Sequence, residues 1–424
     1  MKAHIEYNPA TPATGLRPTA VDLPLSKSLS NRLLIINALA GIGTDRGHVA
    51  ACDDTDAMLQ ALATGRHGYV NIGAAGTAMR FLTAYYATLP GCDITLDGSE
   101  RMRQRPIGIL VDALRQLGAD ITCLEREGYP PLHIKGRILD GGAVEIDGSV
   151  SSQYTSALLM TAPAMTLGME LTLKGSPVSL DYIEMTTAMM NAYGINTIQQ
   201  SNDSMDLCIK VSPGSYSPPL QPFLIEADWS ASSYWYEVAA LTGKTFTLRG
   251  LQIRSLQGDS IVSHIFSQLG VTTCPNNDGS MTVEYDTAGK KPSFIELNMQ
   301  SCPDLAQTVA ATCCGLGIPF RLTGLSTLPI KETDRLEALR QETARLGYLL
   351  TVSQGSILEW DGTTVPAVTD PVIETYKDHR MAMAMAPLAS VNGRLTIENP
   401  AVVSKSYPDF WKHLADAGYQ ISQS

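Results

Sequence analysis

Residues 85–99 read YYATLPGCDITLDGS: a helix-like apolar run, then Gly91, then an alternating segment typical of a strand. The same plan returns four more times along the chain. The glycines of this first series stand 74–77 residues apart, at Gly91, Gly168, Gly243, Gly317 and Gly393, and a shortened copy closes at Gly41. A helix followed at once by a strand, and repeated, indicates an α/β protein.

A second series of glycines runs out of phase with the first. Its members are Gly118, Gly194, Gly270, Gly347 and Gly418, spaced 71–77 residues apart, with Gly65 as the expected first member. A glycine at a helix end allows the positive φ that closes many helices. The two series together predict six copies of a unit with two helices and several strands, the first copy being shortened.

The length of 424 residues is too great for one core, so we expect two domains of three copies each. Prolines at 218, 219 and 222 mark the connection between the third and fourth copies. The N-terminal strand cannot complete a unit locally, and we expect it to pair with the C-terminal half. The expected domains are residues 25–226, and residues 1–24 plus 227–424.

Composition and charge restrict the classes of function. The net charge of −11 argues against a general nucleic-acid or anionic-membrane surface. No apolar run reaches the ~18 residues of a membrane span, and the first 15 residues lack a signal-peptide core, so we expect a cytoplasmic protein. The eight cysteines form no CxxC and no zinc-ligand spacing, which predicts thiols and no metal site.

Lysines and arginines recur where helices are expected to begin. The eight are Lys27, Arg32, Arg80, Arg105, Lys331, Arg335, Arg380 and Lys405. A helix start attracts anions, and stability alone would place acidic residues there. One such cation is typical of a capped surface helix, but eight predict ligands that carry several negative charges. Two of the expected starts also offer Thr77 as a cap and Pro106 as a first helical residue.

Two carboxylates, Asp304 and Glu332, stand among these cations. Asp304 could simply cap its helix, and Glu332 could pair with Lys331. A carboxylate beside a polyanion would repel it, so proton transfer is the alternative interpretation. No Ser-His-Asp order, GxSxG, Walker A or GxGxxG motif indicates another chemistry.

Six motifs in order, SKSLSNR (26–32), AGTAMR (75–80), RMRQRPIG (101–108), DGSVSSQ (147–153), KETDRL (331–336) and DHRMAMA (378–384), resemble the 3-phosphoshikimate 1-carboxyvinyltransferase (EPSP synthase) family. The resemblance covers about Leu23 to Lys405. It implies two domains, each of three βαβαββ repeats in an inside-out α/β barrel, with the active site in the cleft between them. It also implies transfer of the enolpyruvyl group of phosphoenolpyruvate to the 5-hydroxyl of shikimate 3-phosphate, without a metal or organic cofactor.

The resemblance also implies roles for individual residues. Shikimate 3-phosphate would be bound by Lys27, Ser28, Arg32, Ser151, Ser152, Ser179, Tyr182, Asp304, Thr327 and Lys331. Phosphoenolpyruvate would be bound by Lys27, Gly76, Arg105, Gln153, Arg335, Arg380 and Lys405. Asp304 would take the proton of the 5-hydroxyl, Glu332 with Lys27 would act at C3 and the phosphate, and His379 would lie near the reacting carbons. We expect a monomer that binds only these small molecules, with glyphosate as an inhibitor.

Some positions depart from the family pattern. Ala74 and Thr327 stand where asparagines are common, Leu25 replaces a glycine, and residues 180–181 replace a Lys-Pro pair. Two rival interpretations are enolpyruvyl transfer to a UDP-N-acetylglucosamine acceptor, and a non-catalytic anion-binding protein. The first is disfavoured because the loop before Arg105 has no cysteine, and the second because Lys27, Asp304, Glu332 and Arg380 are all present.

Overall fold

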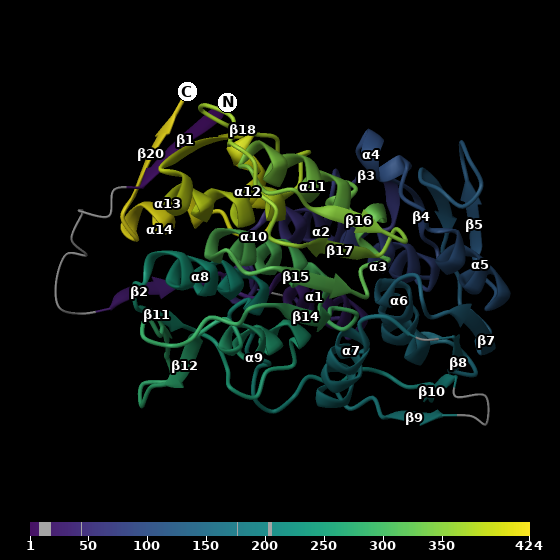
Figure 1. Cartoon of the computed structure of the whole chain (residues 1–424). Coiled ribbons are helices and arrows are strands. Elements are labelled where there is room, and N and C mark those ends of the chain that lie inside the picture. Colours follow the sequence, from purple (N-terminus) through teal and green to yellow (C-terminus); the bar gives the residue numbers. More distant parts are fainter. Residues whose placement is uncertain (8–17, 44, 176, 202–205) are drawn as a thin grey trace. The chain divides into compact units, whose positions relative to one another are not determined.

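The computed structural model describes residues 1–7, 18–43, 45–175, 177–201 and 206–424 (Figure 1). The chain divides into two compact units. The N-terminal unit is Ser26–Ile225, and the C-terminal unit combines Met1–Leu25 with Glu226–Ser424. The boundaries expected from sequence are 24/25 and 226/227. Leu25 and Ala227, which flank the two connections, form an antiparallel bridge inside the C-terminal unit.

The N-terminal unit is built from seven α-helices and two sheets among its described residues. The helices are α1 (Lys27–Leu39), α2 (Asp53–Thr64), α3 (Gly76–Ala87), α4 (Glu100–Arg103), α5 (Gly108–Gln116), α6 (Ser152–Thr161) and α7 (Leu180–Ala192). The strands are β3 (His67–Asn71), β4 (Asp93–Asp97), β5 (Asp120–Cys123), β6 (Leu132–Lys135), β7 (Gly142–Asp147), β8 (Met169–Lys174), β9 (Thr197–Ser201) and β10 (Leu207–Val211).

The C-terminal unit contains three four-stranded sheets among its described residues. Its helices are α8 (Trp229–Thr242), α9 (Val262–Ser267), α10 (Ala306–Leu316), α11 (Arg335–Arg345), α12 (His379–Met385), α13 (Ala389–Asn392) and α14 (Phe410–Asp416). Its strands are β1 (Lys2–Tyr7), β2 (Thr19–Asp22), β11 (Phe246–Arg249), β12 (Val271–Pro275), β13 (Met281–Tyr285), β14 (Ile295–Asn298), β15 (Phe320–Thr323), β16 (Thr351–Ser353), β17 (Ile357–Trp360), β18 (Val372–Ile373), β19 (Arg394–Glu398) and β20 (Tyr419–Gln423).

All five sheets share one topology. The first strand lies parallel to the second, and the third and fourth continue antiparallel, as in the order β3-β4-β6-β5. With α3 and α5 between the strands, this is a βαβαββ unit. The predicted repeat therefore has a structural counterpart in five of the six copies. The first copy, expected to be short, contributes α1 and α2 but no sheet of its own in the described residues, because only residues 40–52 separate these helices.

The predicted N-terminal strand pairs within the C-terminal unit, and a second strand that the sequence did not predict does the same. β1 lies between β19 and β20, antiparallel to both. β2 pairs in parallel with β11, where Phe246 lies opposite Thr19. The chain therefore begins in the C-terminal unit, forms the N-terminal unit, and then returns to the C-terminal unit.

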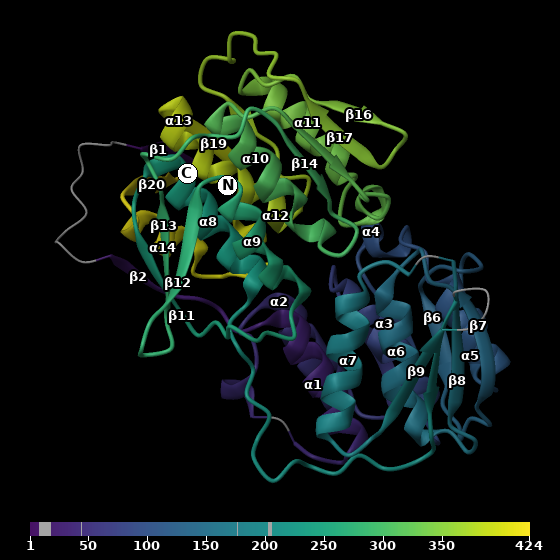
Figure 2. The ribbon, with the colours of Figure 1, turned by 60° about the horizontal axis from the view of Figure 1, so that its bottom comes forward.

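Helices form the centre of each unit, with the sheets around them. In the N-terminal unit α3 packs against α1 and α6, and α7 packs against α1 and α6 (Figure 2). In the C-terminal unit α8, α10 and α12 pack on one another, and every residue of α12 is buried. A helix that is buried on all sides belongs inside a core, and here the apolar residues Met381–Met385 follow the two polar residues that begin α12. Trp229, Tyr234 and Trp235 of α8 are likewise buried.

The predicted glycines all have positive φ, namely Gly41, Gly65, Gly91, Gly118, Gly168, Gly194, Gly243, Gly270, Gly317, Gly347, Gly393 and Gly418. Ten of them stand at a helix end or within three residues of it, but Gly91 and Gly168 do not. Helix α3 ends at Ala87, and the 3₁₀ helix after α6 ends at Ala164, so these two glycines lie in the turns before β4 and β8. At Gly243, φ is +68° and the N–H returns to the carbonyl of Ala239, which closes α8. No other residue type adopts this conformation as readily. None of the eight cysteines forms a disulfide in the described part of the chain.

Candidate active site

The βαβαββ unit explains why the predicted site residues gather within each unit. They follow the carboxyl ends of parallel strands: Gly76 comes after β3, Ser152 after β7, and Asp304 after β14. Arg105 follows β4, and Lys331 follows β15. Ligands of open α/β sheets bind beyond these strand ends, where the next helix begins. Each unit therefore has its own cluster of polar helix starts.

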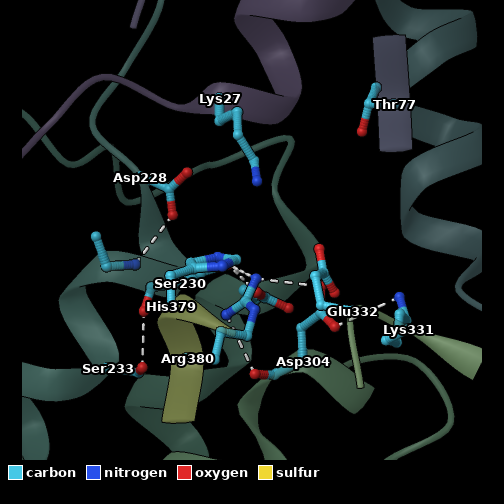
Figure 3. A network of polar contacts seen from close by, with 12 residues as sticks. Lys27, Thr77, Asp228, Ser230, Ser233, Asp304, Lys331, Glu332, His379 and Arg380 are labelled. Carbon is cyan, nitrogen blue, oxygen red and sulfur yellow. Dashed lines mark hydrogen bonds and ion pairs between the residues drawn. The ribbon is translucent and has the colours of Figure 1, made fainter. Parts of the chain in front are cut away.

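Asp304 is the centre of the cluster in the C-terminal unit. It lies in a 3₁₀ turn, Pro303–Leu305, that leads into α10. Its carboxylate accepts a hydrogen bond from Arg335 Nη1 at 2.7 Å and from Arg380 Nη2 at 3.1 Å, and Lys331 Nζ lies 3.5 Å away. Three cations, two from the segment that begins α11 and one from the start of α12, therefore converge on one carboxylate. Figure 3 shows Lys331 and Arg380 near Asp304.

Glu332 forms a second charged contact beside the first. Its carboxylate accepts from Lys405 Nζ at 2.8 Å and from Arg335 Nη2 at 2.9 Å. Arg335 is almost fully buried and also donates from Nε to Asp378 at 2.7 Å. One guanidinium thus links three carboxylates, which fixes their spacing. Such bidentate, charge-assisted contacts are among the strongest hydrogen bonds in proteins.

These contacts shift the ionisation of the cluster. Burial alone would raise the pKa of Asp304, but Arg380, Lys331 and Arg335 outweigh it and hold this pKa well below its ordinary value. Burial opposes the charge of Arg335, yet Asp378, Glu332 and Asp304 raise its pKa. While these contacts persist, Asp304 is a carboxylate with little affinity for a proton.

Asp378 organises the start of α12. It is fully buried, and its carboxylate accepts from the backbone N–H of Arg380 at 2.9 Å as well as from Arg335. His379 is also buried, with Nδ1 3.7 Å from Asp378. The hydroxyl of Thr327 is buried without a hydrogen-bond partner among the described residues. A buried donor of this kind costs free energy until a ligand or water pairs with it.

The N-terminal unit holds its cations differently. Lys27 is the first residue of α1, and its Nζ lies 3.0 Å from Asp54, the second residue of α2. Arg32 is buried and donates to hydroxyls of Thr186 and Ser156 at 2.7 and 3.0 Å. Burial lowers the pKa of Arg32 to about 10, with Tyr182 acting against this shift. Arg32 therefore ties α1 to α6 and α7.

Arg105 lies against the start of α3. A Cβ added to Gly76 would stand 2.6 Å from Arg105 Nη1, so a side chain here would displace this guanidinium. Arg105 is largely buried, and its Nε has no hydrogen-bond partner among the described residues. Arg80 donates to the carbonyl of Pro106 at 2.9 Å, which holds the loop that carries Arg105. A cation and a helix start thus face one position, which suits an anion.

Hydroxyls and an amide complete this second cluster. Gln153, near the start of α6, donates to the hydroxyl of Thr77 in α3 at 3.2 Å. Ser151 caps α6, and Ser152 is the first residue of that helix. Ser179 precedes α7 with a φ of +53°, which is unusual for serine. These groups offer donors without adding negative charge.

The chain resembles proteins of known activity over nearly its whole length. The family model described as EPSP synthase (3-phosphoshikimate 1-carboxyvinyltransferase) matches residues 63–414. The chain belongs to this family. A 3-phosphoshikimate 1-carboxyvinyltransferase of Bacteroides fragilis is 47% identical over 402 residues, 95% of each chain. One from Shewanella pealeana is 35% identical, over 92% of this chain and 95% of that one. The solved EPSP synthase of Acinetobacter baumannii has the same fold, with a TM-score of 0.72 at 20% identity over 100% of both chains.

Within this EPSP synthase family fold, some sequence predictions need correction. Arg105 does not precede a first helical Pro106, because α4 ends before it and α5 begins only at Gly108. The carbonyl of Pro106 instead accepts from Arg80 and Tyr154. Lys405 ends a 3₁₀ helix, Pro400–Lys405, rather than beginning one. Thr77 is the second residue of α3 and accepts from Gln153, so it is not the cap.

The structure brings together Asp304, Lys331, Glu332, Arg335, Arg380 and Lys405 in one unit. It brings together Gly76 with Arg105, and Gln153 with Thr77, in the other. Arg32 is engaged inside its unit through Ser156, Thr186 and the carbonyls of Ser28 and Tyr182. Its expected role as a phosphate ligand stays a prediction.

Two carboxylates of this EPSP synthase family member received no role in the sequence analysis. Asp54 pairs with Lys27, and Asp378 pairs with Arg335. Both stand at helix starts, where an aspartate is typical of a cap or first turn and carries no further signal. The described residues contain no group of three His, Cys, Asp or Glu that could hold a metal ion, and no helix there is long and apolar enough to cross a membrane.

Proposed function

We propose that this chain transfers the enolpyruvyl group of phosphoenolpyruvate to the 5-hydroxyl of shikimate 3-phosphate. Family membership supports the activity. The observation that supports the roles of the residues is the convergence of Arg335, Arg380 and Lys331 on Asp304. Both substrates carry phosphate and carboxylate groups, which these cations would bind.

The reaction needs proton transfer but no covalent nucleophile. Protonation of C3 of phosphoenolpyruvate makes C2 cationic, and the 5-hydroxyl attacks C2 as it loses its proton. The C–O bond to phosphate then breaks, and a proton leaves C3. At least one acid and one base must lie within hydrogen-bond reach. In the proposal Asp304 takes the hydroxyl proton, while Glu332 and Lys27 serve C3 and the phosphate.

The ion pairs suggest how substrate binding would activate Asp304. In the structure its low pKa makes it a weak base, because Arg380, Lys331 and Arg335 stabilise its charge. A substrate phosphate or carboxylate would compete for the same guanidinium and ammonium groups. Each cation drawn towards substrate raises the proton affinity of Asp304. Binding and general-base catalysis would thus be coupled through shared cations.

The remaining assignments follow the same division. Lys331, Thr327 and Asp304 would contact shikimate 3-phosphate from the C-terminal unit. Its other ligands would be Lys27, Ser28, Arg32, Ser151, Ser152, Ser179 and Tyr182. Phosphoenolpyruvate would contact Lys27, Gly76, Arg105, Gln153, Arg335, Arg380 and Lys405, with His379 near its carbons. The proposal includes a monomer in the cytoplasm, which light scattering and fractionation would test.

Phosphate release is the direct test. Purified protein would receive phosphoenolpyruvate, shikimate 3-phosphate, or both, with EDTA present throughout. We expect release only with both substrates. Release from phosphoenolpyruvate alone would indicate a phosphatase. Release with UDP-N-acetylglucosamine in place of shikimate 3-phosphate would indicate the rival enolpyruvyl transfer to that acceptor. No release from any mixture would favour an anion-binding protein.

A further inference from the structure

Arg380 contacts Ser230 as well as Asp304. Its Nη1 donates to the backbone carbonyl of Asp304 at 3.2 Å, and its Nη2 donates to the Asp304 carboxylate at 3.1 Å and to the hydroxyl of Ser230 at 3.3 Å. Of these acceptors, the Ser230 hydroxyl is the one that holds Nη2 independently of Asp304. Ser230 in turn donates a hydrogen bond to the carboxylate of Asp259. A guanidinium can only donate, so Ser230 accepts from Arg380 and its single proton points to Asp259. Figure 3 shows Ser230 and Asp304 close to Arg380.

Asp259 is a buried residue rather than a surface acid. It is 2% exposed, and its second oxygen has no hydrogen-bond partner among the described residues. It lies in a 3₁₀ helix, Gly258–Ile261. The preceding Gln257 accepts from the backbone of Trp229 at 3.1 Å and donates to the carbonyl of Ala227 at 2.8 Å. Asp259 is therefore held beside the start of α8, where Ser230 lies.

A buried carboxylate is costly unless it pairs with a charge. Arg380 is a cation that acts on Asp259, and it does so across the Ser230 hydroxyl. Neither Ser230 nor Asp259 belongs to the residues expected to touch substrate. The hydrogen-bonded series Asp259–Ser230–Arg380 would keep Arg380 in place if the Asp304 carboxylate stopped contacting it.

We propose that Ser230 and Asp259 are positioning residues that hold the Arg380 guanidinium for phosphoenolpyruvate when Asp304 turns to proton transfer. This inference rests on the proposed role of Arg380 as a ligand of phosphoenolpyruvate. Asp304 serves both as an anchor of Arg380 and as a base, and the two roles conflict. The Ser230–Asp259 pair removes the conflict by supplying an anchor that takes no part in the chemistry.

The test compares the variants Asp259→Asn, Ser230→Ala and Ser230→Thr with Arg380→Ala in steady-state kinetics. Asp259→Asn and Ser230→Ala should each raise KM for phosphoenolpyruvate about tenfold, as for loss of a charged hydrogen bond. The KM for shikimate 3-phosphate should change less than about twofold. Ser230→Thr keeps the hydroxyl and should restore most of the wild-type KM. Ser232→Ala is the matched control, because the hydroxyl of this buried serine in the same helix donates to the carbonyl of Trp229 and, within the described residues, to no side chain of the cluster.

A double-mutant cycle separates positioning from a general structural effect. Asp259→Asn added to Arg380→Ala should cause no further loss, since Asp259 acts through Arg380. Additive losses, or equal increases in both KM values, would overturn the inference. If Arg380→Ala itself leaves KM for phosphoenolpyruvate unchanged, the proposed role of Arg380 fails instead. If Asp259→Asn does not fold, Ser230→Ala in the same cycle decides.

Discussion

The two clusters of helix starts differ in what balances their cations. In the C-terminal unit, Arg335, Arg380, Lys331 and Lys405 pair with Asp304, Glu332 and Asp378. In the N-terminal unit, Arg32 and Arg80 meet carbonyls, hydroxyls and a thioether, and Lys27 pairs with Asp54. One repeat therefore produced a cluster rich in ion pairs and another rich in neutral partners.

This difference suggests a division of labour. Among the described residues, Arg32 contacts hydroxyls and carbonyls, so an anion could approach it without first breaking an ion pair, whereas Lys27 would have to leave or share Asp54. In the C-terminal cluster, a cation that bound substrate as proposed would share or lose its carboxylate contact. The freed carboxylate then gains affinity for a proton. Binding alone suits the first cluster, and binding coupled to proton transfer suits the second.

The largest expected effect comes from removing the base of the C-terminal cluster. Asp304→Ala should lower kcat at least ~100-fold while substrate binding stays detectable, because a general base contributes about that factor. Phosphate release gives kcat, and calorimetry gives binding. Near-normal turnover would remove Asp304 from its assigned role.

The matched variant is Asp54→Ala, which breaks a lysine–carboxylate pair in the N-terminal cluster. This variant should lower kcat only about tenfold, because Asp54 orients Lys27 and the other hydrogen-bond donors of the N-terminal cluster remain. If Asp304→Ala and Asp54→Ala lower kcat by the same factor, the proposed division between binding and proton transfer is wrong.

An intermediate effect should follow from Gly76→Ala in the N-terminal cluster. The new Cβ would stand 2.6 Å from Arg105 Nη1, so the end of a flexible side chain must move. We expect KM for phosphoenolpyruvate to rise about tenfold, as for one lost charged hydrogen bond, with a smaller change in kcat. Gly43→Ala is the control, because its Cβ would meet no atom within 4 Å. An unchanged KM would mean that Arg105 does not bind phosphoenolpyruvate.

The repeat could be predicted from sequence, and the partners of single charges could not. Helix ends are local: a glycine such as Gly317 closes α10 whatever lies elsewhere in the chain. The strand pairing of β1 followed from an incomplete unit. In contrast, Asp378 pairs with Arg335, 43 residues away, and Asp54 pairs with Lys27 through the packing of α1 on α2. Such contacts depend on tertiary packing, which the local pattern does not encode.

Arg32 illustrates the same limit from the other side. The motif SKSLSNR implied a phosphate ligand, and the structure shows a guanidinium buried between Phe81 and Tyr182. Sequence similarity identifies the residue type at a position, whereas burial and hydrogen bonds show its present partners. Asp259 was missed for a related reason: nothing in QGDS distinguishes it from a surface turn.

The smallest expected effect concerns stability, and it tests whether the C-terminal cluster sacrifices stability for function. Burial raises the pKa of Asp259 to about 6, against the charge of Arg380 in α12 and with smaller effects of Asp304 and Asp228. A raised pKa means that the folded state binds a proton more readily than the unfolded state, so stability falls as pH rises from about 4 to 6. The full shift is worth at most about 3 kcal/mol, and the weakened bond to Ser230 offsets part of it.

Asp259→Asn should therefore unfold no more easily than the wild type at pH 7.5, and should be more stable by about 1 kcal/mol. The advantage should shrink as pH falls to 5, where the wild-type carboxyl becomes protonated. Urea unfolding at both pH values measures this. Asp361→Asn is the control: donation from Thr363 lowers the pKa of this exposed acid, so its loss should not stabilise. If Asp259→Asn is less stable than the wild type at pH 7.5, the Asp259 carboxylate stabilises the fold. The C-terminal cluster would then not sacrifice stability for function at this position.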